Sequence, residues 1–348
     1  MSNALDLFSQ QQSNRSRSNW LIFGFVLFFA WLGFGSDLIL LGINRGAPAD
    51  PGGHLPVLGI TLTAYAVISA LWAWNAGAEA ILRSTGARRI EQPETEQQRL
   101  LVNVVEEMCV AAGLARPSIW IIADGDPNAL ATGRDERTAA IAVTQGLLDA
   151  CTRDELQAVV AHELAHIKNY DTRLMTLLAA MVGAITLVSD YMHRMLFQRE
   201  MTRAMGGVVQ RARKKDGGIL VILLLALWLL SWMLAPLISR MMALGVSRKR
   251  EFLADAMSAQ FTRNPMALAT ALEKIERAAA PTRCITRGAA HLCIADPLGR
   301  RVNLREGWLA DLWGTHPPMA VRVSRLRGMA FRDQKRARQA SGEMAQLV

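Results

Sequence analysis

Four long apolar runs interrupt an otherwise polar chain. Residues 20–43 and 55–74 are each long enough to cross a bilayer as a helix, and residues 218–238 form the most apolar run. Residues 174–188 are shorter, so a helix buried in a protein core competes with a membrane span there. The pattern therefore predicts a mainly α-helical integral membrane protein.

The first apolar run follows Arg15 and Arg17, as the apolar part of a signal peptide would. It is too long for a signal peptide, lacks a clear small-residue cleavage site and is followed at once by a second span. We therefore interpret it as an uncleaved anchor. The preceding residues 1–18 are polar and rich in Ser and Asn, and we predict that they are loose.

The pattern between the second and third apolar runs is typical of a folded domain. Residues 94–115 carry apolar side chains at helical spacing, whereas residues 118–124 and 138–148 are strand-like. Thr152 and Glu155 predict a capping box at the start of another helix. Further helices are predicted from about Ser247, from Pro265 behind Asn264, and over the basic C-terminal residues 322–348.

Charge adds an orientation to this picture. The chain of 348 residues has a formal net charge of +9. Basic side chains flank the outer ends of the first two spans, and the loop between these spans carries only Arg45: the flanking residues are Arg15, Arg17, Arg83, Arg88 and Arg89. The positive-inside rule then places the N-terminus and the domain after the second span in the cytoplasm.

The loop between the third and fourth runs, residues 193–218, is also strongly basic. It would lie outside if both runs crossed the membrane, against the charge rule, so the short run 174–188 favours a pair that does not span fully. The alternative is that this loop is an exception to the rule. Its single aromatic residue, Phe197, is not interleaved with the basic side chains at a spacing that would stack bases, so the loop predicts a solvated segment on anionic headgroups and no nucleic-acid binding.

The four cysteines form no C-x-x-C pair: Cys109, Cys151, Cys284 and Cys293. We interpret them as reduced cysteines of a cytoplasmic domain, with zinc ligation as a lesser alternative.

The helix that begins at Thr152 contains the sequence "HELAH". His162 and His166 lie one turn apart on one face, so both imidazoles can reach one metal ion, and Glu163 can touch a water on that ion. Two histidines without a metal would be buried polar groups in need of partners. The motif therefore predicts a metal site.

A catalytic zinc site usually has three protein ligands and one open position. Glu251 in "SRKREFLAD" is the best candidate for the third ligand. Asp255 lies four residues further on, where it could accept a hydrogen bond from a ligand imidazole. Glutamate and aspartate at this spacing are common on helix surfaces, so the interpretation depends on the histidine pair. Asp255 and Glu306 are the next candidates.

The segments "HELAH", "REFLAD" and "THPPMAVR", in this order behind two N-terminal membrane helices, resemble the HtpX-type membrane zinc metallopeptidases. These are relatives of the CaaX prenyl proteases within the gluzincins, and the resemblance covers about residues 19–327. It implies transmembrane helices plus a gluzincin metalloprotease domain with a small β-sheet. The implied parts are a flexible N-terminus (1–18), two transmembrane helices (19–80), a protease domain in two parts (81–171 and 246–330), a hydrophobic helical hairpin with a basic loop between them (172–245) and a C-terminal tail (331–348).

The resemblance also implies roles for individual residues. His162, His166 and Glu251 would hold one zinc ion per chain, with Glu163 as the general base and Asp255 behind a ligand. Arg322 would brace the glutamate ligand, and His316 would help to stabilise the oxyanion. Asn128 and Ala129 in "PNALATG" would bind the substrate backbone, although Leu130 replaces the aromatic residue often found next.

The implied function is a zinc-dependent endopeptidase of the inner (plasma) membrane, with its catalytic domain facing the cytoplasm. It would cleave misfolded or damaged membrane proteins in quality control, so its partners are unfolded or membrane proteins and the lipid bilayer. The alternatives are a prenyl-protein endopeptidase, a branch that usually has more than four spans, and a non-proteolytic membrane scaffold. A metal transporter would need ionisable residues within the spans, and only Asp37 comes near one.

Overall fold

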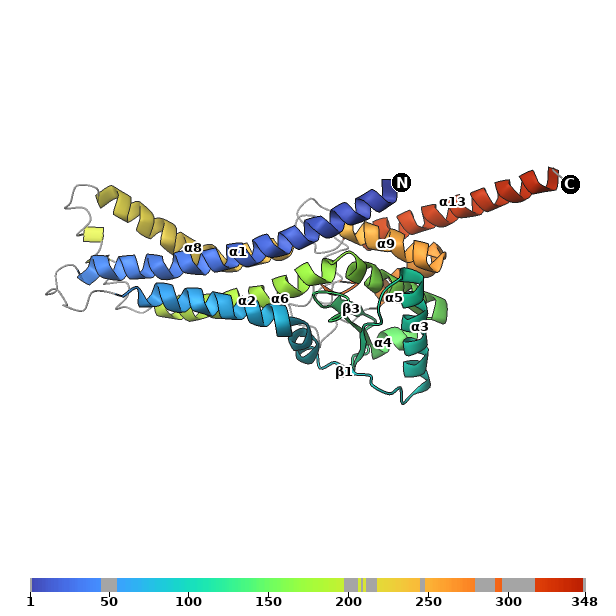
Figure 1. Ribbon diagram of the computed structural model, residues 1–348, viewed down its shortest axis with the longest axis horizontal. Coiled ribbons are helices and arrows are strands. Elements are labelled where there is room, and N and C mark those ends of the chain that lie inside the picture. The colour runs from blue at the N-terminus through green and yellow to red at the C-terminus, as the bar shows by residue number, and fades with distance from the viewer. Residues whose placement is uncertain are drawn as a thin grey trace. The chain divides into compact units, whose positions relative to one another are not determined.

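A computed structural model describes residues 2–44, 55–196, 206–207, 209–210, 218–244, 248–278, 292–295 and 317–346 of the chain. It divides into two compact units (Figure 1). The first unit comprises Met1–Arg15, Ala76–Thr176 and Leu244–Val348, and the second comprises Ser16–Asn75 and Leu177–Ala243. Each unit is therefore assembled from segments that are far apart in the sequence.

The first unit contains a four-stranded mixed sheet with the order β1-β2-β4-β3. Strand β2 runs antiparallel to β1 and parallel to β4, and β3 pairs antiparallel with β4 at the opposite edge. Gly133, in the turn between β3 and β4, has a φ of 124° that favours glycine. The strands are β1 (Arg88–Arg89), β2 (Ser118–Ile122), β3 (Ala129–Thr132) and β4 (Ala140–Thr144).

Helix α5 (Arg153–Lys168) occupies the middle of the first unit. Eleven of its sixteen residues are buried, because it contacts α3, α9, α10 and β3. A helix that is buried on nearly every side belongs to a protein core, and its polar side chains there need partners. The other helices are α3 (Glu96–Ala112), α4 (Gln145–Ala150), α9 (Arg248–Thr262), α10 (Pro265–Arg277) and α13 (Met319–Gln346).

Local signals in the sequence set the beginnings of these helices. Thr152 and Glu155 form the predicted capping box of α5, and Glu155 also pairs with Lys274 of α10 at 2.6 Å. Asn264 caps α10, whose first residue is Pro265. The helices predicted over residues 94–115 and from Ser247 and the strands within residues 118–124 and 138–148 are confirmed.

The second unit consists of parts of α1 (Ser2–Asn44), α2 (Val57–Ser84), α6 (Asp171–Leu196) and α8 (Gly218–Leu244). Phe25 and Phe29 of α1 pack against small side chains of α2 and α8 and against Met181. A Cβ atom on Gly33 would lie 2.6 Å from the carbonyl oxygen of Leu58, so the close approach of α1 to α2 requires glycine here.

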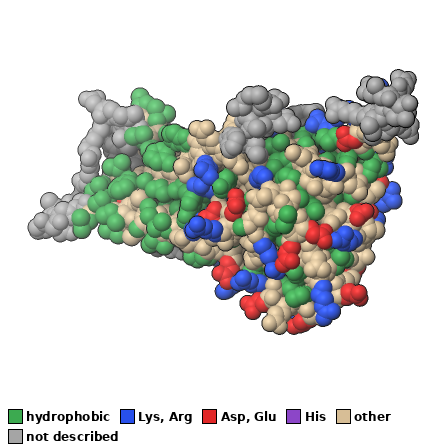
Figure 2. Space-filling model, turned by 45° about the vertical axis from the view of Figure 1, so that its right-hand side comes forward, with side chains coloured by type: hydrophobic (Ala, Val, Ile, Leu, Met, Phe, Trp, Pro, Cys, Tyr) green, Lys and Arg blue, Asp and Glu red, His purple; other side chains and the backbone are tan. Residues whose placement is uncertain are grey.

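Three helices in the described residues are long and apolar enough to cross a membrane. Helix α6 has 26 residues and extends beyond the apolar run 174–188 in both directions, so the shortness of that run is not a reason against a span. Figure 2 shows the hydrophobic side chains gathered over one part of the surface, without charges among them. The exposed ones include Trp20, Leu38, Ile68, Leu187 and Ile219, a pattern that suits lipid and not water.

The prediction of a loose segment over residues 1–18 is wrong. Ser2–Asn44 form one helix, and Asn14 and Ser18 are fully buried. The sequence analysis did not consider that polar side chains on one face of this segment could form hydrogen bonds with a distant part of the chain, as Gln11 and Asn14 do with the carbonyls of Lys168 and Asn169.

Asp37 does not behave as an isolated carboxylate within the spans. Its Oδ1 and Oδ2 atoms accept hydrogen bonds from the backbone N–H groups of Leu58 and Gly59, at 3.1 and 2.6 Å. It therefore satisfies free donors at the beginning of α2, where a negative charge is stabilised by the helix dipole. Asp37 therefore has a structural role, and its presence near a span is not a reason to infer a metal transporter.

The unit assignment leads to a topology prediction, because Met1–Arg15 and the sheet belong to the same unit. With the four native cysteines replaced by serine, a cysteine at Gln97 should resist a membrane-impermeant thiol reagent in intact cells. One at Leu55, between the first two spans, should react, and both should react after the membrane is permeabilised. The reverse labelling pattern in intact cells would contradict the orientation inferred from the basic residues.

Candidate metal centre

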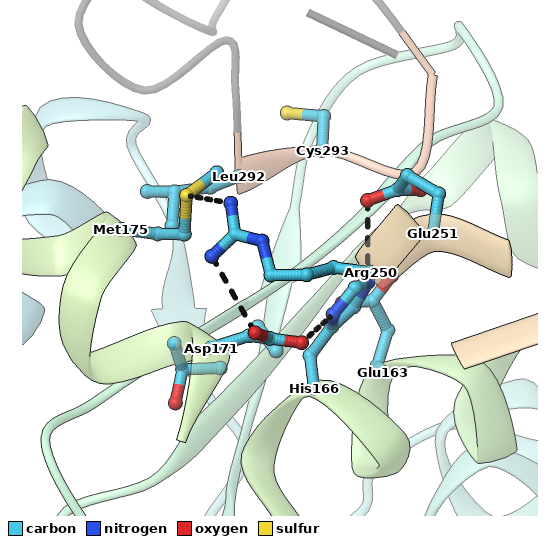
Figure 3. Close-up of a pocket in the computed structure, with 10 residues that line it drawn as sticks. Glu163, His166, Asp171, Met175, Arg250, Glu251, Leu292 and Cys293 are labelled. Carbon is cyan, nitrogen blue, oxygen red and sulfur yellow. Dashed lines mark hydrogen bonds and ion pairs between the residues drawn. The ribbon is translucent and has the colours of Figure 1, made fainter. Parts of the chain in front are cut away.

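Two helices contribute the predicted ligands. His162 and His166 project from the same face of α5, and their Nε2 atoms lie 3.2 Å apart. The carboxylate of Glu251, in the first turn of α9, has one oxygen 3.7 Å from Nε2 of His162 and the other 3.6 Å from Nε2 of His166. Figure 3 shows Glu251 above the His166 ring and Glu163 beside it. The structure thus brings the three predicted ligands together.

A carboxylate holds each imidazole from behind. Oδ1 of Asp255 lies 3.0 Å from Nδ1 of His162, and Oδ2 of Asp171 lies 3.1 Å from Nδ1 of His166. Each carboxylate favours the tautomer with a proton on Nδ1, which leaves the lone pair on Nε2. When neither Nε2 atom carries a proton, both lone pairs face the same point, where they repel one another unless a metal cation lies between them.

The geometry fits a small divalent ion. Two nitrogen ligands at about 2.0–2.1 Å from a tetrahedral zinc would lie roughly 3.3–3.4 Å apart, close to the observed 3.2 Å. One donor atom from each of His162, His166 and Glu251 lies within 4.8 Å of the other two. Two imidazole nitrogens and one carboxylate oxygen are also a ligand set of catalytic zinc sites.

The charges of the site favour a dication as well. Around the imidazoles, four buried carboxylates face two buried arginines, an excess of two negative charges when all are ionised: Glu163, Asp171, Glu251 and Asp255 against Arg250 and Arg322. Burial lowers the pKa of His166, but the hydrogen bond that His166 donates to Asp171 and the charge of Glu251 outweigh it and raise this pKa to about 9. The site therefore attracts positive charge, which a bound metal would supply.

Glu163 differs from the other carboxylates of the site. It is 1% exposed, and neither of its carboxylate oxygens makes a hydrogen bond of normal geometry to the part of the chain that the structure describes. Burial raises the pKa of Glu163 to about 7, although the nearby His166 acts in the opposite direction. A buried carboxylate with such a pKa, beside a metal site, is suited to accept and release a proton.

Arg322 of α13 lies at the back of the site and is completely buried. Its Nε and Nη2 atoms donate to the two oxygens of Asp255 at 2.9 and 2.7 Å, and Nη1 lies 3.4 Å from Oε2 of Glu251. Burial raises the pKa of Asp255, but Arg322 outweighs it and holds this pKa below its usual value. Arg322 thus keeps Asp255 charged behind His162 and contacts the carboxylate of Glu251, as predicted.

The edge of β3 beside the site pairs with residues 293–294 of the same chain. The backbone N–H of Ile294 donates to the carbonyl of Ala129 at 2.9 Å, and Leu130 forms an antiparallel bridge with Cys293. Asn128 is fully buried, and its Nδ2 donates to the carbonyl of Ala295 at 3.2 Å. The predicted substrate-binding residues therefore lie next to the site, and they contact residues 292–295.

Three residues named from the sequence lie outside the described part of the chain: Glu306, His316 and Cys284. Cys109 and Cys151 are free cysteines.

Two residues of the site were missed from the sequence. Asp171 supports His166, and Arg250 lies 3.4 Å from Asp171 while its neighbour Glu251 faces the histidines. Asp171 follows His166 by five residues, beyond the end of α5, so helical spacing could not relate the two. An unexplained carboxylate directly after a "HELAHIKNY" segment was the available signal.

Comparison with known proteins decides the family. The sequence profile of peptidase family M48 matches residues 95–330, which include every described residue of the site. The chain belongs to peptidase family M48. It is therefore a metalloprotease, and its apolar helices make it a multi-pass membrane protein.

Relatives within the M48 family match over most of the chain. A "Protease HtpX homolog" of Streptococcus gordonii is 33% identical over 93% of this chain and 100% of its own length. A protein of the same description from Dictyoglomus thermophilum is 39% identical over 75% of this chain and 78% of its own length. The crystal structure of S. mikatae Ste24p aligns with 16% identity and a TM-score of 0.42, covering 92% of this chain and 67% of that chain, a similarity too low to carry a conclusion.

The pairing of Arg322 with Asp255 gives a stability prediction. Arg322→Gln leaves the Asp255 carboxylate buried without its main partner, so it should lower the free energy of unfolding by about 3–5 kcal/mol. The double variant Asp255→Asn/Arg322→Gln should lose less than the sum of the single changes. Chemical denaturation in detergent measures both values.

Arg327→Gln is the matched control on the same helix. Arg327 pairs with Glu273 at 2.5 Å, and its side chain is 57% exposed. An exposed pair contributes at most about 1 kcal/mol, so this variant should remain close to the wild type. Equal losses for Arg322→Gln and Arg327→Gln would contradict the buried pairing.

Proposed function

We propose that the chain is a zinc-dependent endopeptidase with His162, His166 and Glu251 as ligands and Glu163 as general base. The observation that carries the proposal is the pair of imidazole Nε2 atoms 3.2 Å apart, closed on one side by Glu251. Zinc is preferred over other divalent ions because two imidazoles and one carboxylate are typical of catalytic zinc sites.

Each residue has one task in the proposed reaction. A bound zinc ion would lower the pKa of a water molecule and polarise the peptide carbonyl. Glu163 takes the proton from the attacking water and then gives it to the leaving amine, and its raised pKa of about 7 suits both steps. Asp255 and Asp171 keep the ligand imidazoles in position. His316 is proposed as a donor to the oxyanion, on the resemblance alone.

The edge strand β3 is proposed to hold the substrate in an extended conformation. Backbone pairing of this kind needs an unfolded segment and reads little of its sequence, which fits misfolded proteins as substrates. Asn128 and Ala129 belong to or adjoin this strand. Pairing at Ala129 requires that Ile294 gives up its hydrogen bond to the Ala129 carbonyl.

We further propose that the enzyme acts in quality control of membrane proteins in the plasma (inner) membrane, with its first unit in the cytoplasm. The apolar helices of the second unit support a location in the bilayer, and the basic residues at the ends of the first two spans support the orientation. A purified sample tests the activity directly. Protein prepared in detergent with a chelator present should cleave casein only after zinc is added.

Glu163→Gln should leave zinc bound and lower proteolysis by about 10²- to 10⁴-fold, because an amide cannot accept the proton of the water. The ligand atoms are unchanged by this substitution, so the zinc content should stay at the wild-type value. Metal analysis and a casein assay on the same preparation measure both. Near-normal turnover would exclude Glu163 as the base, whereas a wild type that binds zinc but does not cleave casein would favour a non-proteolytic scaffold.

Glu251→Gln should greatly weaken zinc binding, because it removes the anionic ligand while keeping the shape of the side chain. Asp255→Asn should have a smaller effect, about 10- to 100-fold in zinc affinity or activity, because Asp255 acts through His162. Competition with a chromophoric chelator gives the affinity of each purified variant. Full zinc binding and full activity in Glu251→Gln would show that the third ligand is another residue.

A further inference from the structure

The polar part of α1 that precedes the apolar residues has a buried face. Asn14 is fully buried, whereas its neighbours Gln12 and Arg15 are exposed. Burying an amide side chain without hydrogen bonds is costly, so a fully buried asparagine in a polar segment indicates specific contacts. Those contacts lie within the first unit, to which both Met1–Arg15 and α5 belong.

This face contacts the chain just beyond the metal-binding helix. Gln11 Nε2 donates to the carbonyl of Lys168 at 2.7 Å, and Asn14 Nδ2 donates to the carbonyl of Asn169 at 2.9 Å. The guanidinium of Arg15 lies 4.3 Å from the centre of the Tyr170 ring. The last carbonyls of a helix have no partner within it, so these side chains close the end of α5.

The contact also reaches a residue that supports a metal ligand. Asn14 Nδ2 lies 2.7 Å from Oδ1 of Asp171, while Oδ2 of the same carboxylate lies 3.1 Å from Nδ1 of His166. Nη1 of Arg250 also donates to Oδ1, at the longer distance of 3.4 Å. Because a carboxylate is planar, fixing Oδ1 also fixes the direction in which Oδ2 faces His166 (Figure 3).

We propose that Asn14, in the polar N-terminal part of α1, is a positioning residue for the metal ligand His166, acting through Asp171. The inference rests on the proposed metal site. It adds Asn14 to that site, a residue 157 positions before Asp171 in the sequence. The alternative is that Asn14 only attaches α1 to the end of α5. That role would affect stability but not the metal.

The test compares zinc affinity in the full-length protein purified in detergent, by competition with a chromophoric chelator. Asn14→Ala should weaken zinc binding about tenfold, the lower end of the range for residues behind a ligand. Asn14→Gln keeps the amide but moves it by one methylene, so an intermediate loss is expected and the variant serves if Asn14→Ala does not fold. Two variants on the same helix serve as controls, Gln12→Ala and Gln11→Ala. Gln12 is exposed, and Gln11 donates to the Lys168 carbonyl, away from Asp171, so both variants should bind zinc within about twofold of the wild type.

Two further readouts separate positioning from attachment. The visible absorption spectrum of the cobalt-substituted protein reports the ligand geometry, and it should shift in Asn14→Ala but not in Gln12→Ala. If Asn14 acts through Asp171, then Asn14→Ala should add almost nothing to the affinity loss of Asp171→Asn. The melting temperature without metal, measured in parallel, records any general loss of stability.

Wild-type zinc affinity and an unchanged cobalt spectrum in Asn14→Ala, together with a lower melting temperature, would overturn the role of Asn14 and leave the metal site intact. Fully additive effects of Asn14→Ala and Asp171→Asn would overturn it as well. A wild type that binds zinc no better than His166→Ala would instead overturn the metal site itself, and the inference with it.

Discussion

The burial of polar and charged side chains of α5 is the constraint on which the arrangement of the first unit depends. His162 and Glu163 are almost completely buried in the middle of a helix whose other sides are apolar. Polar groups in such a position are stable only if each has a partner, and charges in addition need compensation. The surrounding elements supply that compensation: α9 brings Glu251 and Asp255, α13 brings Arg322, and the start of α6 brings Asp171.

The arginine side chains around the site do not neutralise all of its buried carboxylates. Two arginines face four carboxylates, and Glu163 has no normal hydrogen bond within the described chain. A stable protein core would not retain such an imbalance unless another group balanced it or the imbalance served a function. In a metalloprotease of family M48, a divalent metal ion would balance the excess negative charge, and a water molecule would be the partner of Glu163.

Anchoring in the membrane and assembly of the site are linked through chain order. The segments of the second unit interrupt the first unit twice, once between Arg15 and Ala76 and once between Thr176 and Leu244. Glu251 and Asp255 return only after the second interruption, and Asn14 comes before the first. The helices that carry the apolar residues also reach the metal site: Asp171, the first residue of α6, contacts His166, and Asn14, in the polar part of α1, contacts Asp171.

The sequence by itself determined the elements whose signals are local. The capping box at Thr152, the asparagine cap before Pro265 and the spacing of His162 and His166 all depend on residues within one or two turns, and all were confirmed. The approach of Glu251 to the histidines was expected from the resemblance, and the structure brings these three residues together. Only the tertiary structure showed the contacts of Asn14, Asp171 and Arg250 and the pairing of Ile294 with Ala129. These contacts join residues that no periodicity relates, because packing of distant segments around a buried charge, and not local backbone preference, brings them together.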